Sequence, residues 1–277
     1  MTLSRVEQAA HNNARWCNTM CRAHDASGEF HQAAWLTRHP APRFYLNLVT
    51  LSEQHVVTQL ADVHGLLAAA LPGNWGVKDS FCALNLRALA FELLFEAGWL
   101  WRDPAQTPRH DPAGRIRWGR VHDGFELAKW EAAWSGNAAN RSPRRHPRLF
   151  VPSLLTDPDI AFLVAYDDGK IVAGAVANRT DDVVGLSNVF SPPEENVSFW
   201  TGCVATAQDT FPGMALVGYE HGPALAAQAV GFELLQPLRV WVHPDRTAVT
   251  PPATATRARR HDGAKHRRSQ PRRATPR

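Results

Sequence analysis

Residues 161–177 of this 277-residue chain read AFLVAYDDGKIVAGAVA, and this stretch decides the fold. Asp168 and Gly169 lie between two apolar runs, which is a strong short-range signal for a β-hairpin. A polar turn at 179–182 then leads into a further apolar, β-branched segment. The sequence therefore predicts three consecutive antiparallel strands, at 160–166, 170–178 and 183–190.

Helices and further strands are expected on both sides of this hairpin. Before it, 117–121 reads as a strand, and Asp123 is a good N-cap for a helix that continues to Trp134. After it we expect a helix, a strand, a short helix and a last strand, at 194–210, 214–219, 223–230 and 232–242. Residues 117–243 should thus form an α/β (α+β) domain with a mixed, mostly antiparallel sheet flanked by helices.

The first 103 residues read as a separate N-terminal α/β region. A helix is expected from Val6 to His24 and another from a Ser52 cap to about Ala70, with strands at 44–51, 77–81 and 90–101. Half a sandwich buries one face poorly, so 1–103 should pack on the second domain. The proline-rich segment 104–116 reads as a linker.

The charge of the chain is divided unevenly. Residues 244–277 contain nine arginines and one lysine against two aspartates, so they carry +8 and the remainder carries −4. This tail has too few large apolar residues to fold alone and is expected to be disordered. Clustered arginine favours weak, salt-sensitive binding to nucleic acid. A merely accessory extension explains the tail equally well.

No feature of the sequence indicates export or a membrane. The N-terminus lacks the apolar core of a secretory signal, and no run approaches the roughly 20 apolar residues of a membrane span. Four scattered cysteines are too few for a disulfide scaffold and are expected to be reduced thiols. We therefore expect a cytoplasmic protein that does not bind membranes.

The predicted order of elements resembles the GNAT superfamily of acyl-CoA N-acyltransferases. Within the hairpin, the Asp-Gly-Lys turn at 168–170 and the V-x-G that follows at 172–174 are similar to the family's second and third strands. Gly231 and Phe232 are similar to its "G-F" entry into a late strand. The resemblance covers roughly 120 residues and two short motifs.

This resemblance implies a fold, a reaction and a place for a cofactor. It implies transfer of an acyl group from acetyl-CoA or another acyl-CoA to a small-molecule or peptide amine. Cofactor-binding residues are expected at the end of the strand 183–190, around Val189, Phe190 and Ser191.

Two positions depart from the family's pattern. Where the family has a Q/R-x-x-G-x-G/A loop, residues 190–197 read FSPPEENV. Proline removes N–H donors and glutamate repels pyrophosphate, so this loop cannot bind CoA in the usual way. Ala227 stands where the family often has a tyrosine that acts as general acid. A non-catalytic ligand- or protein-binding module with the same fold is therefore the alternative function, and whether the chain is an enzyme stays open.

Glu220 and His221 are the catalytic candidates. They follow a predicted strand, histidine titrates near neutrality, and a neighbouring carboxylate can orient it. The simpler interpretation is a polar strand-to-helix turn. Lys78 to Ser80 could likewise hold a polar substrate group or be an exposed strand end. The sequence does not identify the acceptor, the acyl group or the oligomeric state.

Two other groups of residues have simple structural interpretations. Cys17, Cys21 and His24 share one helical face, which suits a metal site or, more simply, buried small side chains. No metal site is therefore predicted. Six tryptophans gather near the expected domain junction, where they would line an apolar cleft or fill the core, namely Trp75, Trp99, Trp101, Trp118, Trp130 and Trp134.

Overall fold

The structure, a computed structural model, describes residues 3–104, 115–136, 148–192, 196–222 and 224–244. Residues up to Asp245 form one compact unit. Most of the predicted linker 104–116 and of the predicted tail 244–277 lies outside the described residues. The assignment of those two segments therefore stays a prediction.

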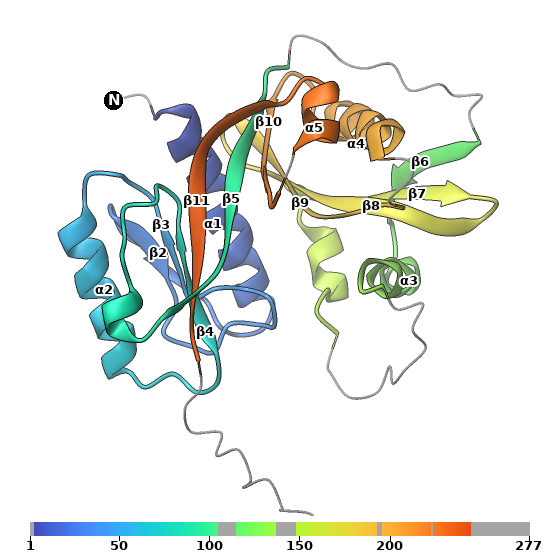
Figure 1. Ribbon diagram of the computed structural model, residues 1–277. Helices are drawn as coiled ribbons and strands as arrows, with labels where there is room; N and C mark the ends of the chain where they lie inside the picture. Colours follow the sequence, from blue (N-terminus) through green and yellow to red (C-terminus); the bar gives the residue numbers. More distant parts are fainter. Residues whose placement is uncertain (1–2, 105–114, 137–147, 193–195, 223, 245–277) are drawn as a thin grey trace, which may run out of the picture. The chain divides into compact units, whose positions relative to one another are not determined.

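The described residues form helices on both faces of one eleven-stranded sheet (Figure 1). The helices are α1 Arg5–Arg22, α2 Val56–Ala68, α3 Gly124–Trp134, α4 Asn196–Thr210 and α5 Leu225–Ala229, with short 3-10 turns η1 Arg87–Leu89 and η2 Pro152–Thr156. The strands are β1 Glu29–Phe30, β2 Ala34–Leu36, β3 Leu48–Thr50, β4 Trp75–Asp79, β5 Glu92–Arg102, β6 Ile116–Arg120, β7 Ile160–Asp167, β8 Lys170–Arg179, β9 Val183–Phe190, β10 Ala215–Glu220 and β11 Glu233–His243.

The strand order is nearly symmetric about the central pair β11–β5. The order is β1-β2-β3-β4-β11-β5-β10-β9-β8-β7-β6. On one side α2 links the parallel strands β3 and β4, and on the other α4 links the parallel strands β9 and β10. In each half the inner strand of that parallel pair is antiparallel to a central strand. The two halves are thus two similar α/β units.

The two halves of the sheet exchange their central strands. β5, from residues 1–103, pairs with β10 of the second half, and β11, from residues 117–243, pairs with β4 of the first half. β5 thus lies between β10 and β11, with Trp101 opposite both Val217 and Glu233. The boundary predicted between 103 and 117 is not tested by these contacts, but both regions contribute to one hydrogen-bonded sheet.

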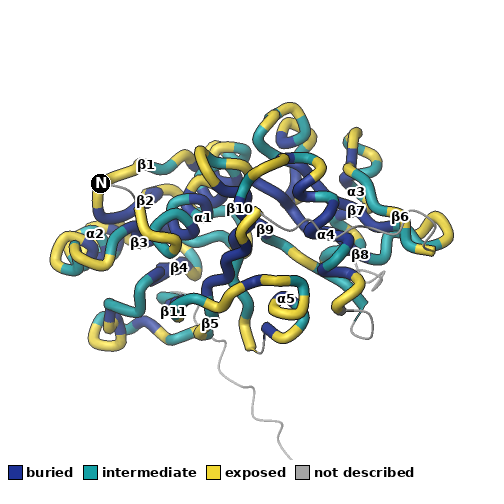
Figure 2. Tube along the Cα trace, turned by 90° about the horizontal axis from the view of Figure 1, so that it is seen from above, coloured by how far each residue is buried: buried dark blue, intermediate teal, exposed yellow. Residues whose placement is uncertain are grey.

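Helices cover the two faces of the sheet because successive strand residues point to opposite sides. α1 packs on Val217 and Val240, whereas the neighbouring residues Leu216 and Trp241 face α4 and α2 respectively. α3 shares a hydrophobic cluster with α1, and α5 shares one with α4. Inner strands of the sheet such as β4 and β7 are accordingly largely buried (Figure 2).

α1 connects the two halves of the sheet. It begins with a capping box in which Ser4 and Glu7 bond each other's backbone N–H groups. Asn12, in its second turn, donates to the Asn178 carbonyl oxygen at 2.9 Å and accepts from the Asn178 amide at 3.0 Å. These buried bonds attach α1 to β8. Gly185 of β9 leaves the space that the two amides occupy.

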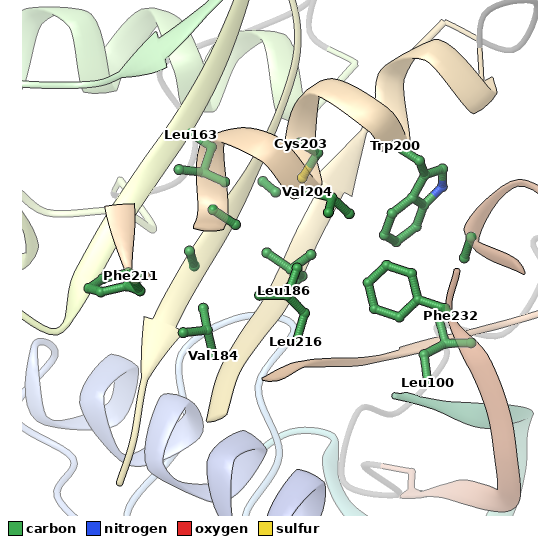
Figure 3. Packing of buried hydrophobic residues seen from close by; sticks show 14 of the residues in the cluster. Leu100, Leu163, Val184, Leu186, Trp200, Cys203, Val204, Phe211, Leu216 and Phe232 are labelled. Carbon is green, nitrogen blue, oxygen red and sulfur yellow. The ribbon is translucent and has the colours of Figure 1, made fainter. Parts of the chain in front are cut away.

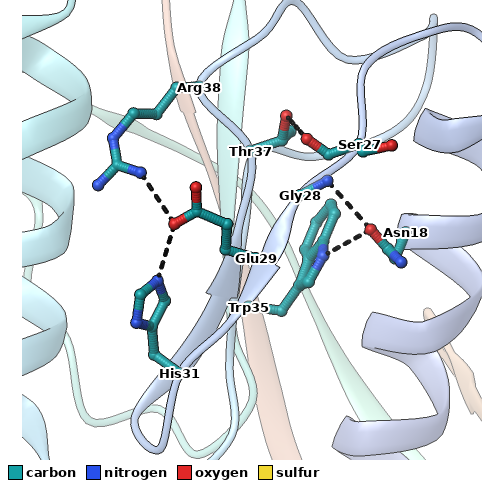
Figure 4. A network of polar contacts seen from close by, with 8 residues as sticks. All are labelled: Asn18, Ser27, Gly28, Glu29, His31, Trp35, Thr37 and Arg38. Atoms are coloured by element: carbon teal, nitrogen blue, oxygen red, sulfur yellow. Dashed lines mark hydrogen bonds and ion pairs between the residues drawn. The ribbon is translucent and has the colours of Figure 1, made fainter.

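A second polar network attaches α1 to the first strands (Figure 4). The Asn18 carboxamide oxygen accepts from the Gly28 backbone N–H and from Trp35 Nε1, both at 3.1 Å. Glu29 is paired at the surface with Arg38 and His31. Because Trp35 is fully buried, the bond from Asn18 satisfies a donor that would otherwise cost free energy.

The structure confirms the predicted fold class and most of its elements. The order of strands and helices predicted for 117–243 is the observed order, and the helix predicted from Val6 is α1. The Ser52 cap is wrong, because α2 begins after His55 and the Ser52 hydroxyl instead accepts from the Gln54 N–H. β1 and β2 were not predicted, since two or three residues carry too little periodicity.

Candidate functional site

The two parallel strands β9 and β10 separate towards their C-terminal ends. Their pairing covers only Val183 to Gly185 of β9 and Ala215 to Val217 of β10. β10 continues along β5 up to Glu220, and β9 continues along β8. We call the region between residues 186–190 and 218–220 the β9–β10 opening.

A β-bulge shapes the β9 side of the opening. Ser187 is opposite Val176 and Phe190 is opposite Gly174, so Asn188 and Val189 together face a single residue of β8. Asn188 has a φ of 52°, in the left-handed region that asparagine tolerates better than most residues. Such a bulge bends its strand and redirects the side chains.

The predicted catalytic residues end β10 at this opening. Glu220 is half-buried, and burial raises the pKa of its carboxyl group, opposed by the charge of His221. His221 Nδ1 lies 2.8 Å from the Glu96 carbonyl oxygen. A carbonyl only accepts, so Nδ1 carries the hydrogen and Nε2 of the neutral ring keeps its lone pair. The catalytic roles of both residues stay predictions.

The predicted cofactor-binding residues lie at the end of β9. Val189 is 39% exposed, whereas Phe190 is half-buried against Trp130, with ring centroids 5.2 Å apart. With Ser191 they line a small pocket of about 10 Å³, which has room for about one water molecule. The pocket is completed by Trp118, Gly174, Phe199, Trp200 and Cys203.

The side of the opening that faces α4 and α5 is filled by hydrophobic residues. Figure 3 shows Leu186 and Leu216 of the two strands beneath Trp200 of α4, with Phe232 beside them. The Trp200 and Phe232 rings meet edge to face at 5.3 Å. Ala227, which replaces the family's tyrosine, is 1% exposed in this same cluster.

The side that faces α1 is polar, and of its residues only Lys78 was named from the sequence, as a possible holder of a polar substrate group or an exposed strand end. The Tyr45 hydroxyl donates to Asn188 Oδ1 at 3.3 Å. Lys78 Nζ lies 3.9 Å from the centroid of the Tyr219 ring and donates to Asn13 Oδ1 at 2.8 Å. The interpretation of Lys78 as an exposed strand end is wrong, because it is 3% exposed and β4 is buried throughout. The signal in the sequence that could have indicated this burial is a lysine within the apolar stretch of β4.

A wider groove of about 640 Å³ runs between α3 and the β7–β8 hairpin. Three of its polar side chains already have structural partners. Asp123 caps α3, and Glu126 accepts from the His122 N–H and from the Tyr166 hydroxyl. Burial and the bond to Glu126 raise the pKa of Tyr166 to about 12. We therefore do not place the functional site there.

The remaining candidates from the sequence have ordinary positions. Cys17 and Cys21 are buried in an apolar cluster, and His24 Nε2 bonds the Leu149 carbonyl oxygen at 2.8 Å. Across the described ranges, no three His, Cys, Asp or Glu side chains are grouped as metal ligands. Within those same ranges no helix has the length and apolar character to cross a membrane. All six tryptophans are core residues or pack on the core, and Trp118 also lines the small pocket.

Solved structures of other proteins have this architecture. No protein-family model and no curated protein sequence matches the chain. A GCN5-related N-acetyltransferase from Kribbella flavida matches it with a TM-score of 0.56 at 16% identity, over 85% of this chain and 95% of that one. A putative acetyltransferase of the GNAT family from Novosphingobium aromaticivorans matches with a TM-score of 0.51 at 11% identity, over 84% and 97%.

A third solved structure has the same architecture and no known function. It is a conserved protein from Staphylococcus epidermidis, with a TM-score of 0.54 at 10% identity over 80% of this chain and 95% of that one. Identities this low show the fold alone. Because the solved structures are covered almost completely, the likeness includes both halves of the sheet. The chain therefore has the fold of these GCN5-related N-acetyltransferase (GNAT) structures.

Proposed function

We propose that the chain transfers an acyl group from an acyl-CoA to an amine at the β9–β10 opening. The observation that carries this proposal is the separation of β9 from β10 beside the Asn188–Val189 bulge, with Glu220 at the end of β10. An unpaired strand edge offers backbone N–H and C=O groups to an extended ligand. The opening thus brings a binding edge and an acid/base group to the same place.

The end of β9 fits the amide-bearing arm of an acyl-CoA. Val189, Phe190 and Ser191 lie beyond the last pair with β10, so their strand edge is suited to the amide groups of an extended chain. Pro192 has no N–H, and two glutamates follow in the sequence, so the pyrophosphate needs a position other than the fold's usual loop. The bound cofactor would supply a thioester carbonyl carbon for an amine to attack.

Glu220 or His221 would accept the proton of the acceptor amine. An amine attacks only in its neutral form, so a base must take the proton from its ammonium form. Burial raises the pKa of Glu220, which makes its carboxylate a stronger base. His221 Nε2 carries the lone pair that its bond to Glu96 leaves free. Glu220 is our first candidate for the base, and His221 is the second.

The alternative is a non-catalytic ligand-binding module, and one observation favours it. The packing of Trp200 on Phe232 closes the side of the opening that faces α4 and α5. Ala227 is buried in that cluster and cannot serve as an acid. In this alternative only the side that faces α1 binds a ligand.

Isothermal titration calorimetry of the full chain with acetyl-CoA distinguishes the two functions. Acyl transfer predicts micromolar binding that Glu220→Gln retains, while turnover with a panel of amines is lost in Glu220→Gln and retained in the surface control Lys170→Met. The Lys170 side chain is exposed on β8. An absence of binding at millimolar acetyl-CoA would refute the transfer proposal and favour the binding module.

A further inference from the structure

Lys78 places a cationic side chain inside the molecule next to the opening. It is 3% exposed, and its Nζ donates to Asn13 Oδ1 at 2.8 Å. Two aromatic faces lie around it, with centroids 3.9 Å away for Tyr219 and 5.9 Å away for Trp99. Throughout the described residues, Lys78 Nζ has no carboxylate within the 4.0 Å of a salt bridge.

The titratable groups around Lys78 do not supply the missing negative charge. Burial raises the pKa of the Cys17 thiol and raises the pKa of the Tyr45 hydroxyl well above its usual value, so both stay neutral at physiological pH. Asp79 follows Lys78 in β4, so its side chain points to the opposite face of the sheet. Its carboxylate accepts the backbone N–H groups of Ala83 and Leu84 at 3.1 and 2.8 Å.

A buried ammonium group without a counter-ion is costly. The neutral amide of Asn13 and the π faces of two rings compensate only part of the lost hydration. Removing one partner of a buried ion pair normally costs several kcal/mol for the same reason. An anion bound next to Lys78 would remove this cost, and the ammonium has two further N–H donors with which to bind it.

The surroundings of Lys78 lead to the opening. Tyr219, whose ring lies against the ammonium group, is the penultimate residue of β10, and it is partly exposed. Across the opening lies the partly exposed Asn188 of the bulge, held by the Tyr45 hydroxyl at 3.3 Å. A ligand at the opening on the α1 side therefore meets one cation, two aromatic side chains and neutral hydrogen-bonding groups.

We propose that Lys78 binds the carboxylate of a free amino acid that enters the β9–β10 opening from the α1 side. A single ammonium group matches one carboxylate, whereas a phosphate dianion would demand more positive charge or backbone donors. Glu220 follows Tyr219 in β10, so its side chain points to the face of the sheet opposite Lys78, and the amine of the same ligand would reach it only through the opening. Its role as acyl acceptor rests on the proposed function, while the carboxylate site does not.

The test measures binding of the twenty free amino acids to the full chain, each compared with its methyl ester. The ester keeps the amine and removes the negative charge. We expect at least one amino acid to raise Tm while its ester does not, and calorimetry to show at least a tenfold weaker affinity in Lys78→Met. The control Lys170→Met should bind as the unaltered chain does. If no amino acid binds better than its ester, or if Lys78→Met keeps the affinity, the proposal is wrong.

A second measurement separates binding from a structural role of Lys78. Because methionine fills a similar volume without a charge, Lys78→Met should leave the Tm of the ligand-free chain unchanged or raise it. A fall of more than about 5 °C would show that Lys78 stabilises the fold and would overturn the proposal. If an amino acid binds but acetyl-CoA does not, the proposed carboxylate site stands and only the proposal of acyl transfer is refuted.

Discussion

Replacing Gly185 with alanine tests how α1 is attached to the sheet. A Cβ at this position would lie 1.9 Å from Asn12 Oδ1 and 2.6 Å from Asn178 Oδ1, far inside van der Waals contact. The Asn12 side chain must therefore leave, and it loses its bonds to the Asn178 carbonyl, the Asn178 amide and Thr180. At about 0.5–1.5 kcal/mol for each bond, plus the strain of overpacking, the expected loss is about 3–5 kcal/mol.

Urea unfolding followed by tryptophan fluorescence measures this loss as a lower midpoint at unchanged slope. The matched control is Gly119→Ala in β6, where the added Cβ meets nothing within 4 Å and the change should stay within about 0.5 kcal/mol. In an Asn12→Ala background the cost of Gly185→Ala should fall by at least about 1 kcal/mol, because the closest clash is gone. A cost below about 1 kcal/mol in the unaltered chain would refute the reasoning.

Three further predictions concern the sheet, the thiols and Glu220. Deleting residues 1–103 removes β5 from between β10 and β11, so circular dichroism should show no cooperative melting; a cooperative transition would contradict the shared sheet. Burial raises the pKa of both thiols, to about 11 for Cys82 and about 12 for Cys203, so at pH 8 exposure decides the order, and a thiol reagent should modify the half-buried Cys82 before the buried Cys203; equal rates would contradict the packing. Burial raises the pKa of Glu220, so ionising it costs folding free energy above the unfolded pKa. Glu220→Gln should therefore raise Tm at pH 7 and leave it unchanged near pH 3; the opposite pattern would exclude the burial effect.

Local signals in the sequence predicted most of the elements. The Asp168-Gly169 turn fixes a hairpin through neighbouring residues alone, and Asp123 caps α3 through the backbone N–H groups of Phe125 and Glu126. Both depend on residues a few positions apart, which is why they can be recognised without a structure. The Ser52 cap failed because a serine competes for turn bonds as readily as for helix caps.

Of the residues of the candidate site, the sequence predicted mainly those at the ends of predicted strands. Val189 was found from the resemblance to the GNAT superfamily, and Glu220 from its place beside a histidine after a predicted strand. Lys78 was named only in a stretch that had two open interpretations. Tyr45 and Asn188 were not identified, since the residues of the side that faces α1 lie far apart in the chain. Their contacts depend on α1 and β4 being brought against β9 and β10, which no local pattern encodes.

The sequence by itself determined the fold class and the hairpin of β7 and β8. The tertiary structure alone decided that β5 completes the other half of the sheet, that Trp200 and Phe232 fill one side of the opening, and that Lys78 is buried on the other. The reason is physical: periodicity, capping and turn chemistry act over a few residues, whereas strand exchange and burial are decided by the free energy of packing distant segments.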